Sequence, residues 1–147
     1  MVTSKFDFAR YIARDITQLE RYRRRYINER LKDKEYQGLM YSAILFLKFN
    51  AGACQDKLCA EIMIDKGNGT RLCRQMEDLG YIRREQSKID RRQNLLYLTE
   101  LGEEQIPFIE DVMVSWREMI TAGFTDEECT QLLDLLGKMV DNLHEIF

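Results

Sequence analysis

Residues 83–102 of the chain read RREQSKIDRRQNLLYLTELG, and this stretch decides the fold. Five basic residues surround Asp90, a run rich in strand-forming residues follows at 94–99, and residues 99–103 then begin a helix. Residues 81–85 also favour a strand, so two short strands joined by a polar connection predict a β-hairpin. A flexible basic tail would not need the strands, and an ordinary surface hairpin would not need so much positive charge.

Two short helices are predicted just before this hairpin. Residues 55–63 place apolar side chains one turn apart, and residues 70–80 place theirs on one helical face with basic and polar side chains opposite. Asp65 is well placed as the N-cap of the second helix, and Gly80 as its C-terminal stop. The apolar face of the second helix consists of Leu72, Cys73, Met76 and Leu79, and the opposite face of Arg71, Arg74 and Gln75.

Longer helices are predicted on both sides of this region. Apolar residues recur with helical spacing over 6–32 and again over 36–53. A further helix is expected over 99–121, with a kink at Pro107 because proline lacks an amide donor. The sequence TDEE at 125–128 has the Thr-x-x-Glu pattern of a capping box and begins a last amphipathic helix.

The composition is that of one compact domain. The chain has 147 residues, of which 45% are hydrophobic and 32% charged, which argues against disorder. No apolar run approaches the roughly 20 residues of a membrane span, and the start MVTSKFDFARYIARD is too charged for a signal peptide. Four cysteines without paired spacing suit a reducing compartment. We expect a single, mainly α (α+β) domain in the cytoplasm, with no membrane partner.

Charge is distributed unevenly along the chain. The net charge is −3, but residues 1–53 carry 11 basic and 6 acidic side chains, whereas residues 100–147 carry 2 and 12. Residues 66–99 carry 8 basic and 4 acidic side chains. An acidic protein can therefore present one basic edge. The basic run RYRRRY at 21–26 is interpreted as a helix face neutralised by the acidic C-terminal segment.

Residues for catalysis are scarce. His144 is the single histidine, so a His/Cys zinc site or a Ser-His-Asp triad has almost no residues from which to be built. No nucleophile and base pair is evident in the sequence. We expect a protein that is not an enzyme, with no catalytic residues, no metal site and no cofactor.

The two short helices and the hairpin together predict a helix-turn-helix followed by a wing. An α-helix fits the major groove of DNA, which is about 12 Å wide and displays a distinct donor and acceptor pattern for each base pair. Arginine at a hairpin tip suits the narrower and more electronegative minor groove. The pattern therefore favours binding to double-stranded DNA.

The segments CQDKLCAEIMIDKGNGTRLCRQMEDLGYIRRE (54–85) and DRRQNLLYLTELG (90–102) resemble the MarR family of winged helix-turn-helix transcription regulators. The resemblance covers about 50 residues without a gap. A helix-turn-helix pattern joined to Asp-Arg-Arg in the wing and Leu-Thr-x-x-Gly at its exit is a specific combination. The positions that match are Leu58, Asp65, Lys66, Thr70, Arg71, Met76, Glu77, Gly80, Tyr81, Ile82, Arg84, Asp90, Arg92, Leu98, Thr99 and Gly102.

The resemblance implies an architecture and an assembly. Residues 36–99 would form the winged helix-turn-helix lobe, and residues 1–35 and 100–147 a helical dimerisation region, because the first and last helices of the family form an obligate dimer interface. A homodimer with two-fold symmetry would bind an inverted repeat with half-sites about 10 base pairs apart. The implied function is that of a ligand-responsive repressor.

The wing is expected to read the minor groove. Arg92 matches the family's wing arginine, and Asp90 is expected to hold basic side chains in register. Lys88 and Arg91 would contact phosphates, which strengthens binding at any sequence and makes it salt-dependent.

The second short helix is expected to read bases in the major groove. Lys66 lies beside its positive N-terminus, where a phosphate would approach. Arg71 and Arg74 are the better base readers, because an arginine can bind guanine through two hydrogen bonds. With the wing, the predicted DNA-binding residues are Lys66, Asn68, Thr70, Arg71, Arg74, Lys88, Asp90, Arg91 and Arg92.

Two glycines depart from the expected pattern of this helix. Gly69 stands on the core-facing side, where the family usually has a branched apolar residue, and Gly67 lies one turn from Arg71. Each glycine costs a helix about 0.8 to 1 kcal/mol relative to alanine. We expect the first turn to be loose in the free protein and to order on DNA.

The resemblance also implies a small aromatic or phenolic effector, bound in a crevice between the dimerisation helices and the DNA-binding lobe. Aromatic residues of the surrounding helices could line this crevice, although an aromatic stripe on a helix is also typical of plain core. The candidate ligand-binding residues are Tyr11, Tyr22, Tyr26, Tyr41, Phe46 and Trp116.

Two alternatives to this interpretation stay open. Some relatives sense oxidants through a thiolate. Here Cys59 and Cys73 occupy inward positions that suit inert packing, so Cys54 and Cys129 are the better sensor candidates. The other alternative is a winged-helix protein-interaction module that does not bind DNA, which an acidic recognition face or a missing wing arginine would favour. Neither feature is seen.

Overall fold

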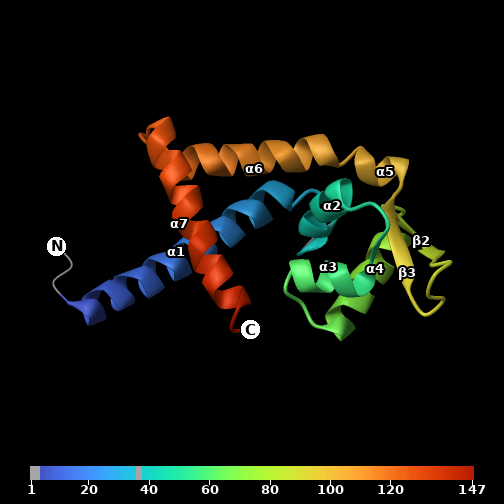
Figure 1. Ribbon diagram of the computed structural model, residues 1–147. Helices are drawn as coiled ribbons and strands as arrows, with labels where there is room; N and C mark the ends of the chain where they lie inside the picture. The colour runs from blue at the N-terminus through green and yellow to red at the C-terminus, as the bar shows by residue number, and fades with distance from the viewer. Residues whose placement is uncertain (1–3, 36–37) are drawn as a thin grey trace. The chain divides into compact units, whose positions relative to one another are not determined.

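The computed structural model describes residues 4–35 and 38–147, which form helices and a small sheet (Figure 1). The chain divides into two compact units, Met1–Val112 and Met113–Phe147. The mainly α class with a small sheet is confirmed. The elements are α1 (Lys5–Leu31), α2 (Met40–Phe49), β1 (Ala53–Cys54), α3 (Gln55–Glu61), α4 (Lys66–Asp78), β2 (Ile82–Gln86), β3 (Asn94–Leu98), α5 (Glu100–Glu103), α6 (Ile106–Ile120) and α7 (Asp126–His144).

Helix α1 begins at a polar cap and is buried only near its end. The Ser4 hydroxyl accepts a hydrogen bond from the Asp7 amide at 3.0 Å, which satisfies a free donor of the first turn. Ile27 and Leu31 are buried, whereas Phe6 in the first turn is 74% exposed. Helix α1 therefore packs in the first unit through its C-terminal part.

The basic run on α1 has a partner within its own helix. Glu20 accepts hydrogen bonds from Arg23 and Arg24, one turn further along. Arg30, which lies after the run, pairs with Asp111 at 2.9 Å. We expected the acidic C-terminal segment to neutralise this run. For Arg23 and Arg24 the acidic partner is instead Glu20 of the same helix.

Strand β1 is missing from the sequence prediction, which extended the second helix over 36–53. Helix α2 ends at Phe49, and Gly52 follows in the left-handed region at φ +80. The Gly52 amide then donates to the Leu96 carbonyl at 2.8 Å, and β1 pairs antiparallel with β3 in a sheet of order β1-β3-β2. Tertiary pairing thus decides residues 50–54. Residues 36 and 37, where the predicted helix and lobe begin, lie outside the described residues.

Helix α4 has the predicted ends and the predicted buried face. The Asp65 carboxylate accepts from the Asn68 amide at 2.9 Å, and Gly80 adopts φ +77 just past the C-terminus. Because the capped helix begins at Lys66, it is longer than the segment 70–80 expected from the apolar pattern. Helices α2, α3 and α4 gather beside the sheet (Figure 1) around the fully buried side chains Ile44, Leu47, Leu58, Cys73, Met76 and Leu96.

Gly69 allows α3 and α4 to approach each other closely. Its backbone is buried, and a Cβ at this position would overlap the Cys59 Sγ, while Cys59 Cβ would lie 3.7 Å away. A branched apolar residue does not fit here. The unusual glycine is therefore explained by the thiol that packs against it.

Replacing Gly69 with alanine is expected to lower the free energy of unfolding by about 2 kcal/mol, because overpacking outweighs the gain of about 0.8 to 1 kcal/mol in helix propensity. Cys59→Ala removes the obstructing sulfur, so in that background Gly69→Ala should no longer destabilise. Urea unfolding of the two single variants and the double variant, followed by circular dichroism, measures this coupling. Equal costs in both backgrounds would show that the sulfur is not the obstruction.

The Leu-Thr-x-x-Gly signature closes the sheet onto α5. The Thr99 hydroxyl accepts from the Gly102 amide at 3.1 Å and donates to the Gly80 carbonyl, while the Thr99 amide donates to the Tyr81 carbonyl at 3.0 Å. Gly102 is buried, and a Cβ on it would overlap the Tyr81 carbonyl oxygen. Thr99 and Gly102 thus join the end of β3 to the residues that lead into β2.

The helix predicted over 99–121 is interrupted. Helix α5 ends at Glu103 and α6 begins at Ile106, so the chain does not form one helix with a kink at Pro107. Pro107 lies in the first turn of α6, where a missing amide donor has no intrahelical acceptor to satisfy. Proline therefore marks the start of a new helix rather than a kink within one.

The second unit contains the end of α6 and α7. The predicted capping box is confirmed: the Thr125 hydroxyl accepts from the Glu128 amide at 3.2 Å, and the Glu128 carboxylate accepts from the Thr125 amide at 2.9 Å. None of the residues of α7 is buried. Over the described parts of the chain, no helix combines the length and apolar character that crossing a bilayer requires.

Candidate nucleic-acid interface

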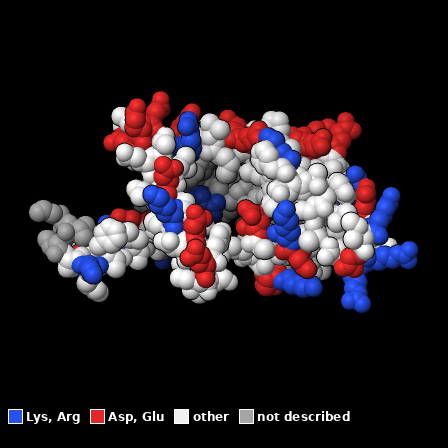
Figure 2. All heavy atoms as spheres, viewed as in Figure 1, with Lys and Arg blue, Asp and Glu red and all other residues white. Residues whose placement is uncertain are grey.

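The nine predicted DNA-binding residues are exposed and lie on α4 and the wing, which we define as β2, β3 and the loop 87–93 between them. Figure 2 shows basic side chains projecting from the edge of the molecule at which Figure 1 places β2 and β3. At about 3.6 residues per turn, Arg71 and Arg74 lie opposite the buried face of α4. The outward face of this helix is therefore cationic.

The N-terminal part of α4 and the base of the wing line one pocket of about 280 Å³. Lys66 and Thr70 come from α4, while Arg84 and Arg92 come from the wing. Thr70 is fixed in place, because its hydroxyl donates to the Lys66 carbonyl at 2.9 Å and accepts from the Gln55 amide group at 2.8 Å. The structure thus brings the two predicted DNA-reading elements together on one face.

On its other flank α4 carries a short chain of hydrogen bonds. Asp65 accepts from both the backbone and the side-chain amide of Asn68, and the side-chain Oδ1 of Asn68 accepts from the Arg71 guanidinium at 3.1 Å. The hydrogen bonds from Asn68 hold the pKa of Asp65 below its ordinary value. The N-cap therefore also orients Asn68 and, through it, the Arg71 guanidinium.

The wing tip is organised by backbone hydrogen bonds to two side chains. The Ser87 hydroxyl accepts from the amides of Ile89 and Asp90, both at 3.2 Å, and Ser87 is buried. Asp90 accepts from the Arg92 amide at 3.0 Å. Asp90 therefore shapes the main chain at Arg92, whereas the sequence led us to expect that it holds basic side chains.

Three supporting residues were not singled out from the sequence. Gln55 positions Thr70, Ser87 organises the wing tip, and Glu77 pairs with Arg84. The Arg84 Nε lies 2.7 Å from a Glu77 carboxylate oxygen without hydrogen-bond geometry, so the contact is ionic and connects α4 with β2. Glu77 and Arg84 are among the positions that resemble the family, which is the one signal that could have indicated this pair.

The four cysteines occupy two kinds of environment. Cys59 and Cys73 are buried, as expected, and burial raises the pKa of the Cys73 thiol to about 11, which disfavours the reactive thiolate. Cys54 is half-buried and lines the pocket between α4 and the wing, so the fold supplies basic neighbours that are distant in sequence. Cys129 is half-buried in the first turn of α7.

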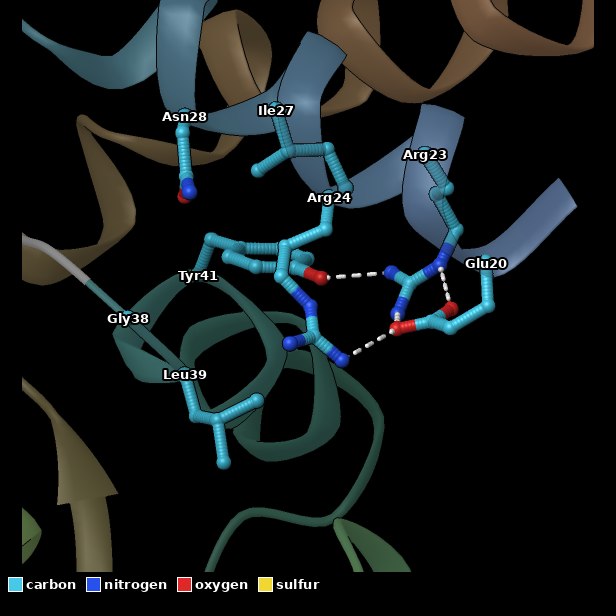
Figure 3. A pocket seen from close by; sticks show the side chains of 8 residues that line it. All are labelled: Glu20, Arg23, Arg24, Ile27, Asn28, Gly38, Leu39 and Tyr41. Atoms are coloured by element: carbon cyan, nitrogen blue, oxygen red, sulfur yellow. Dashed lines mark hydrogen bonds and ion pairs between the residues drawn. The ribbon is translucent and has the colours of Figure 1, made fainter. Parts of the chain in front are cut away.

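A second pocket, of about 370 Å³, lies between α1 and the start of α2. Figure 3 shows Arg23, Arg24 and Tyr41 directed toward it. Arg23 donates to the Tyr41 hydroxyl at 2.7 Å and to Glu20 at 2.8 Å. The hydrogen bond from Arg23 to Glu20 holds the pKa of Glu20 below its ordinary value. Ile27 and Leu39 add apolar walls.

The six candidate ligand-binding aromatics are dispersed. Tyr41 lines the pocket between α1 and α2. The Cζ atoms of Arg10 and Arg14 each lie 4.9 Å from the centre of the Tyr11 ring. Tyr26 lies against Arg30, which donates a hydrogen bond to the Tyr26 hydroxyl. Tyr22 is exposed on α1, Phe46 is half-buried on α2, and Trp116 is half-buried on α6.

Comparison with known proteins places this arrangement among transcriptional regulators. No family model matches the chain. The chain is 27% identical over 131 residues to the HTH-type transcriptional regulator BilQ of Clostridioides difficile (strain CD3), covering 89% of this chain and 84% of the relative.

Solved structures give the same result. The crystal structure of a MarR transcriptional regulator from Methanosarcina mazei Go1 superposes with a TM-score of 0.87 at 26% identity, over 94% of this chain and 99% of that one. A MarR family transcriptional regulator from Listeria monocytogenes, crystallised with a 26mer DNA, gives a TM-score of 0.84 at 27% identity, over 90% and 89%. In its fold, its wing and its helix-turn-helix, the chain is therefore similar to MarR-type winged helix-turn-helix transcriptional regulators over most of its length.

Proposed function

We propose that the protein is a sequence-specific regulator that binds double-stranded DNA in the cytoplasm, as a homodimer on an inverted repeat, and that it is a repressor released by a small ligand. The observation that carries the proposal is that Lys66 of α4 and Arg92 of the wing line the same pocket. It supports simultaneous contact of both elements with one duplex. The relative crystallised with a 26mer DNA has the same fold, which adds support.

Each basic residue has a separate proposed role at the duplex. Arg71 and Arg74 read base edges from the outward face of α4, and Arg92 enters the minor groove. Lys88 and Arg91 contact phosphates, which raises affinity for every sequence. In this proposal the protein acts by binding DNA and not as an enzyme, because contacts to bases and phosphates require complementary shape and charge but no catalytic group.

Exposed apolar side chains support the homodimer. On α7, Leu136, Val140 and Leu143 recur at helical spacing and are 44%, 49% and 53% exposed. On α1, Phe8 and Leu19 are 55% and 51% exposed. We propose that residues 1–35 and 100–147 form the dimerisation region, in which a second copy of the chain covers these side chains.

The pocket between α1 and α2 is the proposed effector site. A phenolic or otherwise acidic aromatic compound would meet the Tyr41 hydroxyl and the guanidinium groups of Arg23 and Arg24. The Arg23 to Tyr41 hydrogen bond connects α1 with α2 across this pocket. An effector that competes for either group would therefore act on the junction between the proposed dimerisation region and the DNA-binding lobe.

In vitro selection from a random duplex library, followed by fluorescence anisotropy at several salt concentrations, tests the proposal. The selected sequences should contain two inverted half-sites about 10 base pairs apart. Affinity should fall steeply between about 50 and 200 mM salt, because bound phosphates release counterions. A single half-site would contradict the homodimer, and failure to select any sequence would contradict DNA reading itself.

The same measurement separates the alternatives. Salt-independent binding, or none, would favour a protein-interaction module. The redox alternative rests on Cys54, which shares its pocket with Lys66, Arg84 and Arg92. Loss of DNA binding on mild oxidation, reversed by a thiol reductant, would favour that alternative over a ligand-released repressor.

A further inference from the structure

An apolar side chain stands at the apex of the wing. Ile89 is 100% exposed and lies between Lys88 and Asp90 in the loop that joins β2 to β3. A single exposed apolar residue is common on protein surfaces and does not by itself indicate a partner. What sets Ile89 apart is its place at the tip of the element proposed to enter DNA, where a bound duplex would cover it.

The loop holds Ile89 in a defined place. Its amide donates to the Ser87 hydroxyl at 3.2 Å, and Ser87 is itself buried. Two backbone hydrogen bonds close the base of the loop. The Ser87 amide donates to the Gln93 carbonyl and the Gln93 amide donates to the Asp90 carbonyl, both at 2.9 Å. The Gln86 side chain donates to the Arg91 carbonyl at 2.8 Å. These hydrogen bonds order the loop and hold the backbone of Ile89 at its tip.

The surroundings of Ile89 define the chemistry of the partner. Lys88, Arg91 and Arg92 are exposed in the same loop, so three cations and one carboxylate, that of Asp90, share the loop with the apolar side chain. The minor groove of DNA matches this arrangement, because its rims are phosphates and its walls are the apolar faces of deoxyriboses. A lipid surface also combines negative charge with apolar depth, but binding to it scales with buried apolar area, and one side chain supplies little.

We propose that Ile89 enters the minor groove beside Arg92 and packs against the deoxyribose walls and base edges of the operator. The inference rests on the proposed DNA-binding function and adds to it a contact that involves no charge. Proteins that bind this groove commonly insert apolar side chains there. The contact is most favourable where the groove is narrow, so Ile89 also favours A·T-rich sequence beneath each wing.

An uncharged contact has a distinct experimental signature. Loss of a phosphate contact reduces the slope of log affinity against log salt by about 0.9 per contact. Loss of an apolar contact lowers affinity by the same factor at every salt concentration and leaves that slope unchanged. Salt dependence therefore separates the role of Ile89 from that of its charged neighbours.

The test uses the full-length protein and the duplex recovered by in vitro selection with the unmutated chain. Ile89→Ala should weaken binding about tenfold at all salt concentrations, because each of the two wings of the dimer loses part of an apolar contact. Ile89→Val, which keeps most of the apolar surface, should bind nearly as tightly as the unmutated chain. Lys88→Ala is the charged control and should reduce the salt slope by about 1.8 for two wings.

Three outcomes decide the matter. A uniform loss of affinity for Ile89→Ala that Ile89→Val restores supports the contact. Unchanged affinity of Ile89→Ala, with clear binding by the unmutated chain, overturns the contact and leaves the proposed DNA-binding function intact. If the unmutated chain binds no duplex, both are overturned. Far-ultraviolet circular dichroism confirms that the exposed substitutions leave the fold unchanged.

Discussion

Replacing Gly102 with alanine is expected to lower the free energy of unfolding by about 3 kcal/mol, the upper part of the range for overpacked sites. The added Cβ would overlap the Tyr81 carbonyl oxygen and lie 3.2 Å from Leu98 Cδ2. The carbonyl already accepts the Thr99 amide, so it cannot move without breaking that hydrogen bond. The obstruction is backbone, which gives way less readily than the thiol next to Gly69.

Gly137→Ala is the matched control for this substitution. Gly137 also lies within a helix, but a Cβ there meets no atom of the described residues within 4 Å. This variant should gain about 0.8 kcal/mol from helix propensity alone. Urea unfolding of both variants measures the difference. A Gly102→Ala variant as stable as Gly137→Ala would contradict the close approach of α5 to Tyr81.

Replacing Arg92 with alanine is expected to weaken binding to the selected duplex about 100-fold, which corresponds to about 1.4 kcal/mol for each of two wings. Arg92 lines the pocket shared with Lys66, and its backbone is fixed by Asp90 at 3.0 Å. The backbone of Arg92 is therefore ordered before binding, so its ordering costs little conformational entropy in the complex. The salt slope should also fall by about 1.8, since two cationic contacts are lost.

Arg91→Ala is the control, because Arg91 is the neighbouring residue with the same charge. If Arg91 contacts phosphate alone, its loss should weaken binding to the selected duplex and to a scrambled duplex by the same factor. Replacing Arg92 with alanine should weaken binding to the selected duplex by a larger factor than binding to the scrambled duplex. Anisotropy titrations of both variants on both duplexes give the comparison. If Arg92→Ala lowers the affinity for both duplexes by the same factor, Arg92 does not contribute to sequence recognition.

Sequence alone predicted the elements whose signals are local. The N-cap Asp65, the stop at Gly80 and the capping box at Thr125 each depend on side chains within three residues or on one backbone angle, and the structure has all of them. The burial of Cys59 and Cys73 followed from helical periodicity. Local rules were sufficient at these positions because no distant contact opposes them.

The features that the sequence did not predict depend on distant partners. Strand β1 exists because Leu96, far along the chain, accepts the Gly52 amide. The reason for Gly69 is the Cys59 thiol on another helix, and Tyr81 and Thr99 explain Gly102. At the candidate site the cationic residues could be selected from charge and resemblance, but the pocket that unites Lys66 with Arg92 required the fold.

The hydrogen bonds at the wing tip also bear on how the protein can diverge over evolutionary time. Ser87 and Asp90 fix the course of the loop through main-chain amides, which every residue except proline provides. Positions 88 and 91 are consequently open to exchange without altering the path of the chain. Descendants of this regulator could thus gain or lose phosphate contacts at these two exposed positions, and so change their overall affinity for DNA, while Ser87 and Asp90 are kept.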